Sequence, residues 1–236
     1  MSAEAYLPLW LDAPMQSWGH QSRYDQRTTG LDPTRSGVIG LIAAAMGIDK
    51  HSPDELAQLA TLNPIGMTTV KLPRTNNKGD QLSIERLEDY HTITGYRRAS
   101  GKVAKEATVQ SYRHYLLDAR FGVLLEGPKT VLDKIAAALK DPVWGVWLGR
   151  KCCPPAAPVL VADPCEKSKA WRKLLQQAGY TGEETLEQFD HVIEVASDVS
   201  GADVINDQVV GFGQPIGERH APRWIERKQK SKPAKS

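Results

Sequence analysis

The chain has 236 residues, and its 30 lysines and arginines are nearly balanced by 28 aspartates and glutamates. This length suits one large domain or two small ones with a substantial hydrophobic core. Because the net charge is only +2, the chain as a whole lacks the strongly basic character of a non-specific nucleic-acid binder. Any nucleic-acid site therefore depends on local clustering of charge.

Composition also argues against several classes of protein. The three cysteines, Cys152, Cys153 and Cys165, lack the spacing of a zinc site or of a disulfide framework, so we expect reduced, buried thiols and no metal site. The sequence has no glycine-rich nucleotide loop, and we expect no cofactor. No apolar run approaches the roughly 18 residues that cross a bilayer, and the first residues do not resemble a signal peptide. We expect a cytoplasmic protein with no membrane contact.

The N-terminal part begins with a strand and a helix. Residues 6–11 are mostly apolar and predict a strand, in which Pro8 indicates an edge position or a bulge. Thr34 or Ser36 can cap the helix that follows, and Gly47 can end it. The helix is predicted from apolar residues at helical spacing: Val38, Leu41, Ile42, Ala45 and Met46. Glycines at 37 and 40 weaken this helix, which indicates that a strand or a ligand approaches it closely.

The middle of the chain predicts further strands and a second helix. Two strands with a turn-rich segment between them read as a hairpin, and a poorly periodic insertion follows. The expected elements are strands at 66–72 and 82–87, an extended insertion at 89–110, a strand at 115–125, a helix at 131–139 and a last core strand at 143–148. The resulting order, β-α-β-β-α-β, predicts an α+β fold with a ferredoxin-like core, which is also the RNA-recognition architecture.

Proline and short polar runs interrupt the pattern after about residue 155. We expect one helix at 167–177 and short strands at 191–195 and 209–212. The predicted organisation is a core at 1–154 that includes the insertion, a small β-rich C-terminal appendage at 155–225, and a basic disordered tail at 226–236.

Two short stretches near the N-terminus suggest a site for a phosphate backbone. The start of the first helix, at Thr34, Arg35, Ser36 and Gly37, offers unpaired N–H groups and a guanidinium to an anion. The end of the first strand, at Met15, Gln16, Ser17 and Trp18, offers hydrogen bonds and a stacking face for a single-stranded base. The alternative is an ordinary strand, loop and capped helix with Trp18 in the core.

Local clusters of basic residues provide further candidates. The insertion at 89–110 contains Arg97, Arg98, Lys102 and Lys105 against two acidic residues, a local balance of +2. Arg150 and Lys151 follow Gly149 at the end of the predicted last core strand, where they could reach a phosphate. The alternative for both clusters is a solvated surface with no ligand.

Four blocks of sequence resemble the CasD family, the Cas-five-type subunits of type I-E CRISPR Cascade. They are Pro14–Gly19 with Pro33–Leu41, Asp89–Thr92, Gln110–Ala119 and Leu148–Pro154, in this order and spacing. The resemblance implies a RAMP-superfamily protein that binds the 5′ handle of CRISPR RNA beneath a thumb-like hairpin, here the insertion at 89–110. It adds Gln110 and Arg113 to the RNA-binding candidates. It also implies contacts with the backbone subunit CasC and the large subunit CasA, and indirectly with target DNA.

Catalysis is one alternative function, and a purely structural assembly protein with no direct RNA contact is another. Relatives in type I-C systems cleave CRISPR RNA precursor without a metal, which requires a base, an acid and a cation at one phosphate. Tyr112, Arg113 and His114 supply suitable residue types. However, consecutive strand residues face opposite sides, so Arg113 and His114 should not reach one phosphate together. Because a separate subunit, CasE, cuts the RNA in type I-E systems, the resemblance implies a non-catalytic holder.

Overall fold

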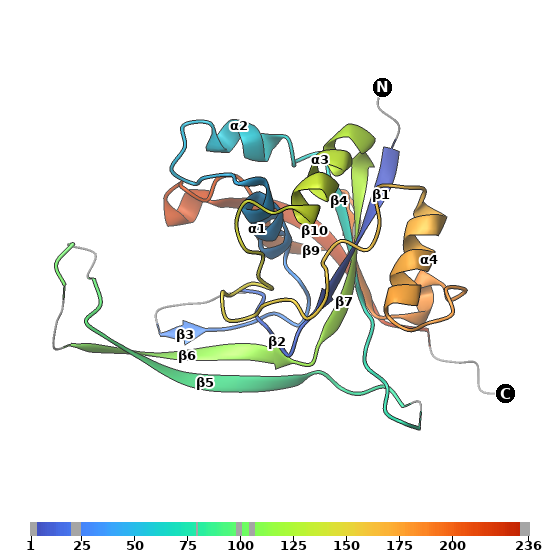
Figure 1. The fold of residues 1–236 in the computed structure, drawn as a ribbon, viewed down its shortest axis with the longest axis horizontal. Helices are drawn as coiled ribbons and strands as arrows, with labels where there is room; N and C mark the ends of the chain where they lie inside the picture. The colour runs from blue at the N-terminus through green and yellow to red at the C-terminus, as the bar shows by residue number, and fades with distance from the viewer. Residues whose placement is uncertain (1–3, 20–24, 79, 98–100, 104–106, 232–236) are drawn as a thin grey trace.

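A computed structural model describes residues 4–19, 25–78, 80–97, 101–103 and 107–231 of the chain. These residues form a mixed α+β structure with two β-sheets and four α-helices (Figure 1). The larger sheet has the strand order β1 (Glu4–Asp12), β7 (Arg120–Pro128), β4 (Gly66–Lys71), β8 (His191–Val195), β10 (His220–Lys228), β9 (Asp203–Val209). The smaller sheet contains β2 (Met15–Gln16), β3 (Gln26–Arg27), β5 (Glu85–Thr94) and β6 (Thr108–Leu117).

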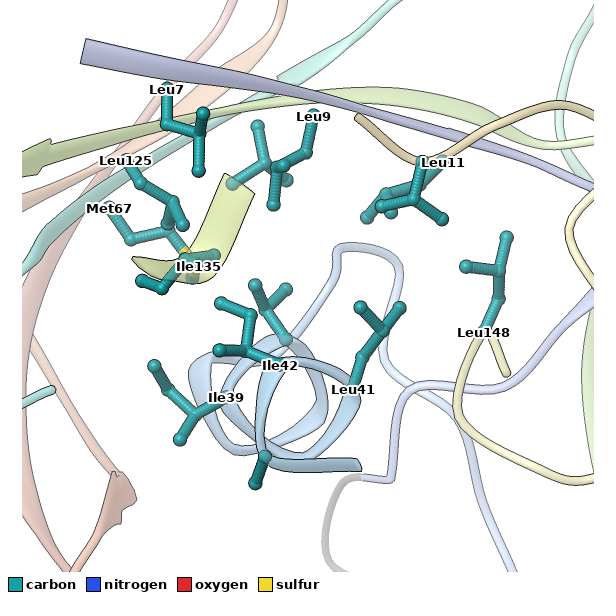
Figure 2. Packing of buried hydrophobic residues seen from close by; sticks show 14 of the residues in the cluster. Leu7, Leu9, Leu11, Ile39, Leu41, Ile42, Met67, Leu125, Ile135 and Leu148 are labelled. Carbon is teal, nitrogen blue, oxygen red and sulfur yellow. The ribbon is translucent and has the colours of Figure 1, made fainter. Parts of the chain in front are cut away.

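Helices cover both faces of the larger sheet. On one face, alternate residues of β1 such as Leu7 and Leu9 pack toward α1 (Arg35–Met46) and α3 (Lys129–Lys140), as Figure 2 shows. On the other face, Trp10 and Val70 pack with α4 (Lys167–Gln177). The short α2 (Glu55–Ala60) lies between α1 and β4 in the chain. The larger sheet therefore lies between α1 and α3 on one face and α4 on the other.

The first helix has the ends that the sequence predicts. The Thr34 hydroxyl accepts a hydrogen bond from the Gly37 N–H at 3.2 Å, and Gly47 ends the helix in the left-handed region with φ of 72°. Gly37 is needed for packing, because a Cβ on it would come within 2.8 Å of Cε3 of Trp18. The close neighbour expected from the glycines is thus a core tryptophan.

The pairing of the middle strands differs from the expected one. Residues 66–72 and 82–87 do not form a hairpin: β4 joins the larger sheet, whereas β5 pairs with β6 from Glu85 opposite Leu117 to Thr94 opposite Thr108. We call this β5–β6 hairpin the thumb; it begins before residue 89 and ends after residue 110. The strand expected at 115–125 is two strands, because the chain turns at Asp118, with φ of 48°, and changes sheet.

The last core strand expected at 143–148 is not formed. This segment instead covers the end of α1, where the Val143 N–H donates to the carbonyl of Ala45 at 2.9 Å. The free edge of β1 is covered by residues 159–165, which make isolated bridges rather than a regular strand. There the Trp10 N–H donates to the carbonyl of Val159 at 2.7 Å. Apolar content alone could not distinguish a strand from this packed loop.

The C-terminal strands continue the larger sheet. The structure contains the helix expected at 167–177, as α4, and the strand expected at 191–195, as β8. The strand expected at 209–212 is wrong, because Val209 is the last residue of β9. Because β8 pairs with β4, the segment expected as an appendage adds three strands to the core sheet. β10 extends to Lys228, past the expected start of the tail, and residues 232–236 lie outside the described residues. No helix among the described residues is long and apolar enough to span a membrane.

Candidate nucleic-acid interface

The arginine at the start of α1 is buried in a cluster of charges. Only 2% of Arg35 is exposed, and its Nη1 lies 2.9 Å from Oε1 of Glu194. Arg223 donates to the same oxygen at 3.0 Å and also donates to both carboxylate oxygens of Asp207. These four residues, which we call the buried ion cluster, tie the first helix to β8, β9 and β10.

The same cluster occupies the helix N-terminus. The Arg35 N–H donates to Oδ2 of Asp207 at 2.8 Å, and the Gly37 N–H is taken by Thr34. Asp207 therefore plays the part of the anion that the positive end of the helix attracts. The phosphate contact expected at Thr34, Arg35, Ser36 and Gly37 is not supported: Arg35 is buried and paired, and Ser36 donates to the Thr34 hydroxyl at 3.4 Å.

The end of the first strand is also committed to the core. Gln16 is fully buried and donates from Nε2 to the carbonyls of Leu11 at 3.1 Å and Ala119 at 2.6 Å. Its Oε1 accepts the indole N–H of Trp18, which is itself fully buried. Trp18 cannot stack on an RNA base in this conformation, so the alternative of a core tryptophan is the one observed. Met15 is half-buried against the core.

Ser17 connects this motif with the basic pair at 150 and 151. The hydroxyl of Ser17 donates to the carbonyl of His114 at 3.2 Å, and its N–H donates to the carbonyl of Leu148 at 3.1 Å. Gly149, with φ of 94°, crosses so close to Ser17 that a Cβ would lie 1.7 Å from the serine carbonyl oxygen. Only glycine fits there, because the left-handed conformation and the contact both exclude a side chain.

Arg150 is anchored across the base of the thumb. Its Nη1 donates to the carbonyl of His114 at 3.3 Å, and its Nη2 donates to the carbonyl of Arg27 at 2.7 Å. Its guanidinium carbon lies 4.6 Å from the ring centroid of Tyr115, within the range of a cation–π contact. Burial raises the pKa of Tyr115, and the hydrogen bond with Cys152 adds to this. Arg150 therefore joins β3, β6 and its own loop.

Three more basic residues surround this anchor. Lys151 follows it and is exposed, and Arg27 lies beside Arg113 where β3 runs parallel to β6. Arg113 donates to the Ser111 hydroxyl at 3.2 Å. Among the described residues, none of these four basic side chains has a carboxylate within ion-pair distance. We call Arg27, Arg113, Arg150 and Lys151 the thumb root.

The sequence drew attention to three members of the thumb root but missed Arg27. Arg27 lies in a two-residue strand with no recognisable motif, so only its pairing with β6 reveals it. Farther along the thumb, Tyr90 and Tyr112 form an aromatic pair with ring centroids 5.4 Å apart, in which Tyr90 is exposed and Tyr112 is half-buried. Gln110 is exposed on the face that carries Tyr112, since both have even positions in β6.

The tip of the thumb carries two of the remaining basic candidates. Arg97 and Lys102 are exposed, and Arg97 forms an isolated bridge with Val103. Arg98 and Lys105 lie outside the described residues. The structure therefore separates the described candidates for RNA binding into a buried or half-buried group near α1 and a half-buried or exposed group on the thumb and the thumb root.

The residues proposed for catalysis do not converge. His114 and Tyr112 point to one face of the thumb, where Nε2 of His114 lies 2.6 Å from Oε2 of Glu88. Arg113 points to the other face, toward Ser111 and the Tyr115 side. His114 and Arg113 lie on opposite faces of the sheet formed by β3, β5 and β6, so they do not act together on one phosphate.

The cysteines do not form a metal site in the part of the chain that the structure describes. No group of three or more His, Cys, Asp or Glu residues there is placed to hold an ion, and all three cysteines are free thiols. Cys152 is exposed, which differs from the expected burial. Burial raises the pKa of Cys153 to about 12, so this thiol is protonated at neutral pH.

Comparison with known proteins identifies the family. The model of the family described as CRISPR-associated protein (Cas_Cas5) matches residues 6–218. The chain belongs to this family. CRISPR system Cascade subunit CasD of Escherichia coli strain K12 is 33% identical over 174 residues, which cover 72% of this chain and 76% of CasD.

Solved structures agree with this assignment to the Cas5 family. A chain of a structure described as CRISPR RNA-guided surveillance complex superposes with a TM-score of 0.71 at 28% identity, covering 97% of this chain and 91% of that chain. A second, described as a crystal structure of Cas protein, gives a TM-score of 0.62 at 25% identity over 94% and 93% of the two chains. The α+β architecture of two sheets is thus that of known Cas proteins.

Proposed function

We propose that this Cas5-family chain is a non-catalytic subunit of a Cascade surveillance complex and holds the 5′ handle of CRISPR RNA. The observation that carries the proposal is the thumb root. Its four basic side chains lack carboxylate partners among the described residues, and Arg150 fixes their arrangement by binding two backbone carbonyls. Such a cluster attracts a phosphate backbone, whereas the near-neutral chain does not.

The thumb supplies the complementary contacts for single-stranded RNA. The exposed Tyr90 and the half-buried Tyr112 lie on the thumb near the polar Gln110. Stacking on aromatic faces combined with phosphate contacts is the usual way to bind unpaired bases. We place the RNA along the thumb root and the thumb, with the described Arg97 and Lys102 near the tip of the thumb; Arg98 and Lys105 remain candidates from the sequence alone. The residues around Arg35 and Trp18 support this surface from the core and do not touch the RNA.

The wider assignment rests on the relatives. The names of the similar proteins, a Cascade subunit and an RNA-guided surveillance complex, support membership of such an assembly. From the resemblance to the CasD family we extend the proposal to a cytoplasmic complex in which this subunit contacts CasC and CasA and reaches target DNA only indirectly. In this proposal, β1-α1-β4-β7-α3 is a ferredoxin-like core in which residues 159–165 replace the last strand.

A non-catalytic role fits the geometry of β6. His114 is paired with Glu88, and Arg113 lies on the opposite face, so this base and this cation do not share a phosphate position. The remaining alternative is a metal-independent endoribonuclease that processes CRISPR repeat RNA, and the binding experiment distinguishes the two functions.

The purified chain is incubated without metal with labelled repeat RNA, and retention and cleavage are followed together. We expect retention of the handle with no cleavage. The double variant Arg113→Ala, His114→Ala should retain RNA more weakly, because Arg113 belongs to the thumb root. Site-specific cleavage that this variant abolishes would overturn the proposal and make the chain a processing nuclease. Absence of retention by the wild-type chain would overturn RNA holding.

A further inference from the structure

Helix α1 is apolar around its whole circumference. After Arg35 and Ser36 it contains only glycine, alanine, methionine and branched aliphatic residues. Leu41 and Ile42 pack into the core shown in Figure 2, but Gly40 and Ala44 are not buried. A helix that is apolar on every side is normally covered on every side. One face of α1 is therefore left unpartnered.

A shallow apolar cavity of about 520 Å³ lies over this face. Its wall residues are aromatic: Trp144 is 45% exposed, and the ring of Phe212 approaches Gly40. The backbone N–H groups of Val143 and Trp144 donate to the carbonyls of Ala45 and Ala44, so the tryptophan wall is fixed to the end of α1. The cavity is lined by Gly40, Ala43, Ala44, Ile48, Asp49, Lys50, Trp144, Phe212 and Arg219.

The rim of the cavity has an excess of positive charge. Lys50 and Arg219 have no carboxylate within ion-pair distance among the described residues. Arg219 donates from Nε to the carbonyl of Gln214 at 2.8 Å, which holds the guanidinium at the rim. The acidic member, Asp49, accepts the His51 N–H at 2.9 Å. An occupant that carries carboxylates would complement the two free cations.

We propose that this surface binds a helix of another protein subunit, with a small-residue or aliphatic face flanked by carboxylates. Gly40 and Ala44, four residues apart, lie on one side of α1; the Phe212 ring contacts this side at Gly40, so a second helix would approach closely at Ala44. Trp144 provides the large, partly exposed aromatic contact typical of the centre of protein interfaces. The carboxylates of the partner pair with Lys50 and Arg219. The proposal rests on membership of a multi-subunit complex but uses none of the thumb-root residues.

The decisive variant is Ala44→Arg, which places a long cation on the floor of the cavity between two other cations. The tagged full-length chain is co-expressed with the other protein subunits of its own CRISPR operon and with CRISPR RNA. Native mass spectrometry of the purified assembly then gives its subunit composition. We expect at least a tenfold loss of one identified protein subunit. The matched control is Ala137→Arg, an exposed alanine on α3, which should assemble like the wild type.

A second pair of variants tests the charge of the rim and does not depend on how Ala44→Arg folds. Lys50→Glu should weaken the same subunit contact at least fivefold and make it less sensitive to salt. Lys134→Glu, at an exposed position of α3, should change neither the strength of the contact nor its salt dependence. Circular dichroism melting of the isolated variants checks the fold.

Other outcomes overturn the proposal. Full assembly of both Ala44→Arg and Lys50→Glu would show that no subunit binds here. If the isolated wild-type chain is a dimer that Ala44→Arg dissociates, the occupant is a second copy. RNA retention by the isolated variants is measured separately. If the variants retain RNA normally and also assemble fully, this inference alone is wrong. If the wild-type chain does not retain RNA, the proposed function is wrong.

Discussion

Two groups of arginines in this chain have opposite environments. In the buried ion cluster, Arg35 and Arg223 are matched by Glu194 and Asp207 and lie almost entirely out of solvent. At the thumb root, the basic side chains have no such carboxylates among the residues that the structure describes, and Arg150 is held by backbone carbonyls and an aromatic ring. Carbonyl dipoles orient a guanidinium but leave its net charge in place. The first group therefore serves the fold, and the second keeps its charge for a ligand.

Replacing Arg35 should have the largest effect. Arg35→Ala leaves Glu194 with only one cationic partner in a buried site, and loss of one partner of a buried ion pair costs about 3–5 kcal/mol. Because Arg223 still pairs with Glu194, we expect the free energy of unfolding, measured in urea, to fall by an amount near the lower end of this range. The control is Arg97→Ala on the exposed thumb, with a change within about 0.5 kcal/mol. An unchanged unfolding midpoint with weaker RNA binding would place Arg35 at the RNA instead.

Gly149→Ala should have an intermediate effect that links the two regions. A side chain in the left-handed region costs about 1–3 kcal/mol, and the contact with the Ser17 carbonyl forces the backbone to move. Because Arg150 follows directly, RNA retention should fall together with the unfolding free energy. Gly19→Ala is the matched control, since a Cβ there meets no atom within 4 Å. If the two variants had the same unfolding free energy and the same RNA retention, the close contact between Gly149 and the Ser17 carbonyl would be contradicted.

Lys151→Ala should have the smallest effect on stability and a specific effect on binding. The side chain is exposed, so the unfolding free energy should change by less than about 0.5 kcal/mol. Loss of one phosphate contact should lower the slope of log affinity against log salt by about 0.7 for single-stranded RNA. Lys134→Ala on α3 should leave that slope unchanged. A slope that is equal for both variants would remove Lys151 from the interface.

Local elements of the fold could be predicted from the sequence, but their pairing could not. Helix α1 has the predicted cap at Thr34 and end at Gly47, because both depend on residues within one turn. The strand expected at 115–125 was divided at Asp118, because a short apolar run does not show where it changes sheet. At the candidate site, the basic residues of the thumb root were found except Arg27, whereas Trp18 and Arg35 were expected at the surface and are buried.

The sequence by itself determined the family motifs, the bounds of α1 and the basic composition of the thumb. Only the tertiary structure decided which of these residues face solvent. Arg35 and Glu194 are 159 positions apart in the chain, and no local sequence pattern predicts that the fold brings this carboxylate to Arg35. The burial of a charge depends on such long-range partners, because a guanidinium leaves water only where folding brings an anion to it.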